Sequence, residues 1–207
     1  MSGHGPTADA VLVAVETHLL SVLGEDRGRA SIAFLGTERY DVLRFGPGEG
    51  DPDDLVRYVT VGVSPRPMDD PSAPVQDPSA PRCELVLSVR GGADSALRTL
   101  GVVAATPAVE GAVLAPHRTV DLGDALWEGS PYTAVLLGEP GHPVPDVDLD
   151  PPAAPVQFLP LVPLHHLEAA WARVHGGRAM RQRLTESGAD PTDPARPVVA
   201  LDPPAAG

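Results

Sequence analysis

The residues best suited to chemistry lie in the stretch FLPLVPLHHLEAAWARVHG, at residues 158–176. On a helix that begins near His165, the side chains of His165 and Glu168 would share one face and could reach one metal ion. His166 would point about a quarter-turn away, and His175 would lie roughly three turns further along. Because a zinc site needs three or four convergent ligands, this spacing favours a structural helix start, with Glu168 at the positive helix end. A small metal-dependent enzyme using His165 and Glu168 is the alternative.

The remaining candidates for catalysis lack parts of their motifs. Cys83 opens an apolar stretch without a cation-rich setting, which predicts a small buried residue rather than a reactive thiolate. No Gly-x-Ser-x-Gly motif occurs, and SVRGGADS lacks the Gly-x-x-x-x-Gly-Lys pattern of a phosphate loop. The acidic runs DPDD and DVDLD lack the twelve-position calcium loop. The sequence therefore predicts no catalytic residue, no cofactor and no enzyme.

The composition limits the expected partners and compartment. The chain of 207 residues has a formal net charge of −13, and it contains no lysine or asparagine, a bias typical of GC-rich bacterial genomes. Nucleic acid and anionic membranes are recognised through clustered cations, so neither suits this chain, whereas a basic protein would be attracted to it. The single cysteine and the lack of an apolar run near ~20 residues predict a cytoplasmic protein without a signal peptide or membrane span.

The periodicity of apolar residues predicts an α+β domain with a mixed, largely antiparallel sheet flanked by helices. Helices are expected at residues 7–23, 94–105, 165–174 and 178–186. Strands are expected at residues 31–35, 41–45, 56–63, 83–90, 117–122, 132–137 and 156–164. We expect a single domain over residues 1–189, with a proline-rich loop at 64–82, followed by a loosely ordered tail at 190–207.

Three placements within this fold are testable. The nearly continuous apolar run at residues 83–90 predicts a central strand. Pro160 and Pro163 predict an irregular or edge position for the last strand, because proline lacks an amide hydrogen. The spacing of the penultimate helix predicts a buried stripe of Leu167, Ala170, Trp171 and Val174.

From residue 83 onward, the order of segments resembles the Suppressor of fused domain family. The resemblance rests on CELVLSV, LRTLGVVAA, APHRTVDL, GSPYTAVLLGEP, VQFLPLVPLHHLEAAW and GGRAMRQRL. The most specific piece is the apolar-Pro-Leu-x-x-x-Glu pattern formed by Val162, Pro163, Leu164 and Glu168. The similarity covers roughly two-thirds of the chain. It implies that the stretch FLPLVPLHHLEAAW is the corner between a strand and a helix, with Glu168 a corner residue and no role for the histidines.

The resemblance implies a non-enzymatic α+β domain that binds another protein. Animal members carry a second domain and clamp a transcription-factor segment as an added strand, whereas short bacterial members often resemble immunity proteins against toxins. This chain resembles the short kind. Where animal members have Gly-Asp-His, it has Ala115, Pro116 and His117, so the acidic contact residue is missing and only His117 carries over.

The expected function is therefore that of an immunity-like or regulatory protein that binds and masks another protein, for example a basic toxin domain or regulatory factor. Loop carboxylates would steer a basic partner toward the chain, although ordinary solubility explains them equally well. The expected partner-binding residues are His117, Asp51, Asp53, Asp54, Asp69 and Asp70.

Overall fold

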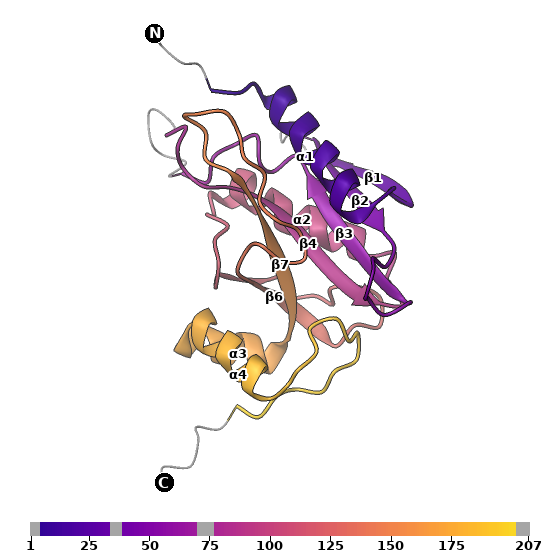
Figure 1. The fold of residues 1–207 in the computed structure, drawn as a ribbon. Helices are drawn as coiled ribbons and strands as arrows, with labels where there is room; N and C mark the ends of the chain where they lie inside the picture. The colour runs from indigo at the N-terminus through magenta and orange to yellow at the C-terminus, as the bar shows by residue number, and fades with distance from the viewer. Residues whose placement is uncertain (1–4, 34–38, 70–76, 202–207) are drawn as a thin grey trace.

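The computed structural model describes residues 5–33, 39–69 and 77–201 (Figure 1). The helices are α1 (Ala8–Leu23), α2 (Ala96–Glu110), α3 (His166–His175) and α4 (Gly177–Glu186). The strands are β1 (Gly28–Ala33), β2 (Arg39–Phe45), β3 (Leu55–Val61), β4 (Arg82–Arg90), β5 (Thr119–Asp121), β6 (Tyr132–Leu137) and β7 (Val156–His165). Across these described ranges, no helix has the length and apolar character needed to cross a bilayer.

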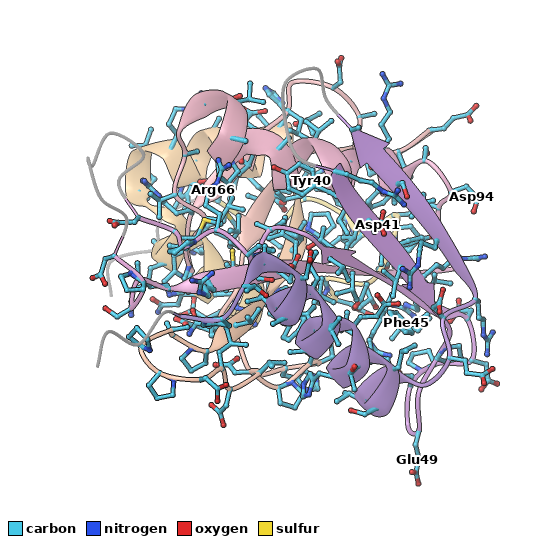
Figure 2. All side chains as sticks on the ribbon, turned by 90° about the horizontal axis from the view of Figure 1, so that it is seen from above. Tyr40, Asp41, Phe45, Glu49, Arg66 and Asp94 are labelled. Carbon is cyan, nitrogen blue, oxygen red and sulfur yellow. The ribbon has the colours of Figure 1, made fainter. Side chains whose placement is uncertain are left out.

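The strands form one sheet in the order β1-β2-β3-β4-β7-β6-β5. Strands β4 and β7 run parallel, and all other neighbouring pairs are antiparallel. Helix α1 packs on one face of the sheet and α2 on the other, as the view from above shows (Figure 2). Helices α3 and α4 lie side by side where β7 ends (Figure 1). The predicted α+β class with a mixed, largely antiparallel sheet is confirmed.

Strand β4 occupies the middle of the sheet and is buried on both faces, as its continuous apolar run predicts. Alternate side chains of the strand, Cys83, Leu85 and Leu87 among them, pack under α2, whereas Val86 packs toward α1. Burial, together with the neighbouring Glu84 carboxylate, raises the pKa of the Cys83 thiol. Cys83 is therefore a small buried residue and not a thiolate.

Strand β7 does not lie at an edge, so that part of the sequence prediction is wrong. It is paired on both sides, with Pro160 opposite Val86 of β4 and Pro163 opposite Val135 of β6. Proline removes one donor but keeps its carbonyl, and Pro160 O accepts from Gly138 N at 2.7 Å. The pairing of β6 with β7 is irregular at Tyr132, where the register shifts.

The predicted buried stripe of α3 is also wrong, because the helix is rotated relative to that prediction. The face that meets the sheet carries Glu168, Ala169 and Ala172. Leu167 and Val174 are 53% and 78% exposed. The rotation has a physical cause: the buried face holds a carboxylate that is neutralised by Arg196, an arrangement that a pattern of apolar residues cannot indicate.

The segment after residue 189, predicted to be a loose tail, lies against the domain as far as residue 201. Arg196 is 3% exposed. Its guanidinium donates to both oxygens of Glu168, at 2.6 and 2.7 Å, and to Pro163 O at 2.7 Å. Val199 N donates to Glu168 Oε1 at 3.0 Å. These contacts fix the segment to α3 and β7, whereas the domain boundary at residue 189 stays a prediction.

Candidate partner-binding site

Strand β5 is the last strand of the sheet, and in the described part of the chain no further strand pairs with its outer side. The backbone N–H and C=O groups of successive β5 residues point alternately toward β6 and away from it. The amide of Leu122 donates to Thr133 O at 3.0 Å, and Val120 is paired with Val135. The backbone N–H and C=O groups of Thr119 and Asp121 therefore point away from β6. Such groups are a template for pairing with another chain.

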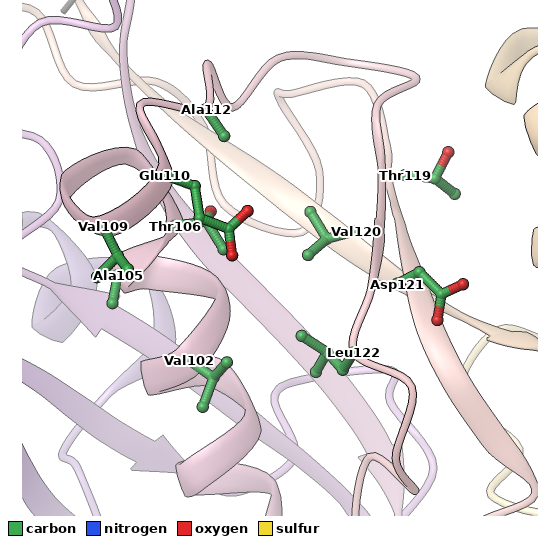
Figure 3. A pocket seen from close by; sticks show the side chains of 10 residues that line it. All are labelled: Val102, Ala105, Thr106, Val109, Glu110, Ala112, Thr119, Val120, Asp121 and Leu122. Carbon is green, nitrogen blue, oxygen red and sulfur yellow. The ribbon is translucent and has the colours of Figure 1, made fainter.

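A groove runs between this open edge and α2 (Figure 3). One part, of about 310 Å³, lies between α2 and β5 and is lined by Val102, Val109, Val120 and Leu122 among others. Val109 is 63% exposed. A second part, of about 560 Å³, shares Val102 and Leu122 and extends to Trp127. The groove offers apolar contacts beside backbone groups that point away from β6.

His117 lies just before β5 in a left-handed conformation, with φ of +65°, which is uncommon for a residue with a side chain. Its amide donates to Leu137 O at 2.7 Å. The imidazole Nε2 lies 2.7 Å from Glu139 Oε1, and the side chain is only 16% exposed. His117 thus shapes the entry to the edge strand through its backbone, and most of its side chain lies inside the molecule.

Gly177, the first residue of α4, packs against the backbone of His117. A Cβ atom built on Gly177 would lie 2.0 Å from His117 O and 2.8 Å from Leu136 Cδ1. No side chain fits at such a distance, so the close packing of α4 on the segment before β5 requires glycine here. The Gly-Gly pair predicts the break between α3 and α4, but nothing in the sequence indicates that Gly177 packs against His117.

The predicted acidic residues that the structure describes lie outside β5, in the segments before and after β3. Asp51, Asp53 and Asp54 precede β3, which is separated from β5 by three strands. Asp53 and Asp54 are exposed. Asp69 accepts from Asp77 N at 2.8 Å, and Asp70 lies outside the described residues. The structure therefore does not place Asp51, Asp53 and Asp54 on the strand that His117 precedes.

Asp51 is engaged within its own loop. Its carboxylate accepts from Arg57 Nη2 at 2.7 Å and from Gly48 N at 2.7 Å. The hydrogen bond from Arg57 is the main cause that lowers the pKa of Asp51, and burial opposes it. A carboxylate already paired with an arginine attracts a basic partner less than a free one does.

The histidine and glutamate that could have formed a metal site are bound to the C-terminal segment instead. His165 Nε2 lies 2.8 Å from Arg196 O, and Glu168 Oε2 accepts from His165 N at 2.9 Å. Burial raises the pKa of Glu168, but the hydrogen bonds from Arg196, Val199 N and His165 N outweigh it and leave the pKa lowered. Within the described ranges, no group of three His, Cys, Asp or Glu residues is placed to hold a metal ion. Both carboxylate oxygens act as acceptors for the arginine.

Comparison with known proteins identifies a family. Residues 36–197 match the family "Suppressor of fused protein (SUFU)". No curated protein matches the chain significantly. A protein of Neisseria gonorrhoeae FA 1090, described as a SUFU homolog, superposes with a TM-score of 0.65 at 17% identity, over 91% of this chain and 96% of that chain.

Two further solved structures share the fold. The Sufu-Fu complex aligns with a TM-score of 0.65 at 13% identity, over 95% of this chain and 93% of that chain. Drosophila Suppressor of Fused aligns with a TM-score of 0.65 at 14% identity, over 94% of this chain and 51% of that chain, so this chain spans about half of it. Because the family match covers most of the sequence, the chain belongs to the Suppressor of fused family.

Proposed function

We propose that this chain is a non-enzymatic module that binds another protein by accepting an extended segment at the open edge of β5. The observation that carries the proposal is the outward-facing backbone of Thr119 and Asp121 beside the α2 groove. A segment added there would form main-chain hydrogen bonds to both residues, and its alternate side chains would enter the groove. A structure with the same fold comes from a complex, that of Sufu with Fu.

The biological role that we propose is that of an immunity-like or regulatory protein of the cytoplasm that masks its partner, for example a toxin domain. Two features support it. The family resemblance implies that short bacterial members serve this role, and a net charge of −13 attracts a basic partner over long range. The exposed loop acids Asp53 and Asp54 are better placed for such steering than the paired Asp51.

The test uses substitutions at Thr119, whose amide hydrogen points outward. Proline at this position removes that donor but leaves the hydrogen bonds between β5 and β6, so Thr119→Pro should fold with a melting temperature close to that of the wild type. Proteins that co-purify with the wild-type chain from its native cells would be isolated singly and titrated by calorimetry. We expect Thr119→Pro to weaken the true partner's binding and the control Thr119→Val to preserve it.

Hydrogen exchange provides an independent readout on the same complex. The amides of Thr119 and Asp121 face outward in the free protein, so they should exchange quickly and become protected when a partner strand is added. Protection confined to the loop at residues 51–54, with Thr119→Pro binding as tightly as Thr119→Val, would show that the partner binds elsewhere.

A further inference from the structure

Helix α3 presents an apolar stripe to the solvent, on the side opposite its buried face. The stripe consists of Leu167, Ala170, Trp171 and Val174, whose spacing places them along one side of the helix. Leu167 and Val174 are among the most exposed large apolar residues of the described chain, and Ala170 is also exposed. Trp171 is half-buried, because one side of its ring packs toward the buried residues between α3 and α4. An apolar helix face of this kind marks an interaction surface rather than a core.

Arginine and histidine side chains lie close to the stripe. On the α4 side, Arg183 Cζ lies 5.7 Å from the centroid of the Trp171 ring, and His175 stacks on that ring with a centroid distance of 4.1 Å. On the β5 side, Arg173 donates to Asp121 at 2.8 Å. Arg178 is exposed and forms no ion pair in the part of the chain that the structure describes.

The charge of this region is opposite in sign to that of the whole chain. Helices α3 and α4 carry four arginines, at positions 173, 178, 181 and 183. Arg173 is paired with Asp121, and Glu168 with the buried Arg196, so three arginines and Glu186 determine the local charge. A local excess of cations on a chain with a net charge of −13 is not explained by solubility, because it reduces the net charge that keeps the chain in solution.

We propose that the α3–α4 surface, defined by Leu167, Trp171, Val174, Arg178 and Arg183, docks an acidic amphipathic segment of a partner protein. Apolar side chains of that segment cover the stripe, and its carboxylates pair with guanidinium groups of α4, which bind carboxylates in a fork geometry. A helix of ten residues is about 15 Å long, which matches two to three turns of a partner helix. This inference does not depend on the edge-strand proposal, since it concerns different side chains.

Charge and size favour a protein segment over two other occupants. A bilayer with anionic lipids is an extended surface, and binding to it would bring the rest of this acidic chain into a repulsive field. A second copy of the chain could pack its own α3–α4 surface on that of the first in a two-fold contact, but this would bring the arginines of both copies close together, where like charges repel. A short acidic segment meets only the local cations.

The probe is a synthetic fluorescein-labelled helical peptide with leucine at positions i, i+3, i+4 and i+7 and glutamate elsewhere, measured by fluorescence polarisation with the full chain. We expect saturable binding that is about tenfold weaker for Val174→Ser, because the peptide then covers a polar residue. The matched control is Val13→Ser, which changes another valine, 65% exposed on α1, and should bind as the wild type does. Arg178→Glu together with Arg183→Glu should abolish binding, whereas Arg98→Glu on α2 should not.

Several outcomes would overturn the proposal. The first is that the leucine–glutamate peptide does not bind. The second is that it binds Val174→Ser as tightly as Val13→Ser. The third is that a peptide with lysine in place of every glutamate binds the wild type equally well. Sedimentation that shows self-association lost in Val174→Ser would assign the surface to a second copy. Flotation with phosphatidylserine vesicles, lost in the same variant, would assign it to a membrane. Thr119→Pro should bind the peptide normally, which separates this surface from the β5 edge.

Discussion

Among the residues that the structure describes, two carboxylates, Glu84 of β4 and Glu168 of α3, are fully buried, and each binds a segment without regular structure. Glu84 accepts hydrogen bonds from Thr60 Oγ1 at 2.6 Å, from Gly62 N at 2.9 Å and from Ser64 N at 3.0 Å. These donors are uncharged, and burial raises the pKa of Glu84 despite them. Glu168 has instead an arginine partner, which keeps its pKa low. The same residue type thus anchors one loop by neutral donors and another by an ion pair.

Removal of the arginine should reveal how strongly Glu168 depends on it. We expect Arg196→Met to lower the free energy of unfolding by ~3–5 kcal/mol, because a buried carboxylate is left without its cation. The control is Arg173→Met, which breaks the exposed pair with Asp121 and should cost at most ~1 kcal/mol. Urea unfolding of the three proteins measures both values. Equal losses in the two variants would mean that the Glu168 pair is no more important than a surface contact.

The same pair predicts how stability changes with pH. The pKa of Glu168 is lowered in the folded protein, so the unfolded chain takes up the proton first as the solution is acidified. The stability that Glu168 contributes is therefore complete above its usual pKa of 4.5 and is lost as the pH falls through the folded value. The difference in unfolding free energy between the wild type and Arg196→Met should shrink as the pH falls. The buried Glu168 of the variant, without its cation, takes up a proton first, and below about pH 4.5 the wild type also loses its ion pair. A difference that stays constant from pH 7 to pH 3 would contradict this assignment.

For the helices and strands, the periodicity of apolar residues predicted those features that depend on apolar side chains alone. Helix α1 and the central position of β4 follow from spacing and from a continuous apolar run, and the structure confirms both. The orientation of α3 could not be predicted from the periodicity of apolar residues. Its inward face is set by Glu168 and by Arg196, which lies 28 residues further along the chain in a proline-rich stretch. The backbone shape before β5, with His117 in a left-handed conformation against Gly177, has no apolar signal either.

The rotation of α3 changes which substitutions should destabilise it. Trp171 is half-buried and packs on His175 and Arg183, so we expect Trp171→Ala to cost no more than ~2 kcal/mol. Met180 of α4 is 0% exposed, and Met180→Ala should cost ~2–5 kcal/mol because it leaves a cavity. Thermal and urea unfolding would rank the two. A larger loss for Trp171→Ala would restore the orientation predicted from the sequence.

At the scale of the whole molecule, the C-terminal segment joins parts of the fold that are far apart in sequence. Thr192 O accepts from Arg90 N of β4 at 2.9 Å. Asp193 O accepts from the hydroxyl of Tyr132, at the start of β6, at 2.6 Å. Arg196 then reaches Glu168 of α3. The segment therefore crosses from the central strand to the C-terminal helices, although its composition resembles that of a disordered tail.

Truncation tests whether the domain is complete without this segment. We compare a chain that ends at residue 201 with one that ends at residue 189, so that the difference reports on residues 190–201 alone. The shorter chain leaves the Glu168 carboxylate without its cation and Tyr132 without its backbone acceptor. We expect its free energy of unfolding to be lower by at least ~3–5 kcal/mol. Urea unfolding, with limited proteolysis as a second readout, measures the effect. If the chain ending at 189 unfolds at the same urea concentration as the longer one, residues 190–201 are the loosely held tail that the sequence predicts, and their contacts add nothing to the stability of the domain.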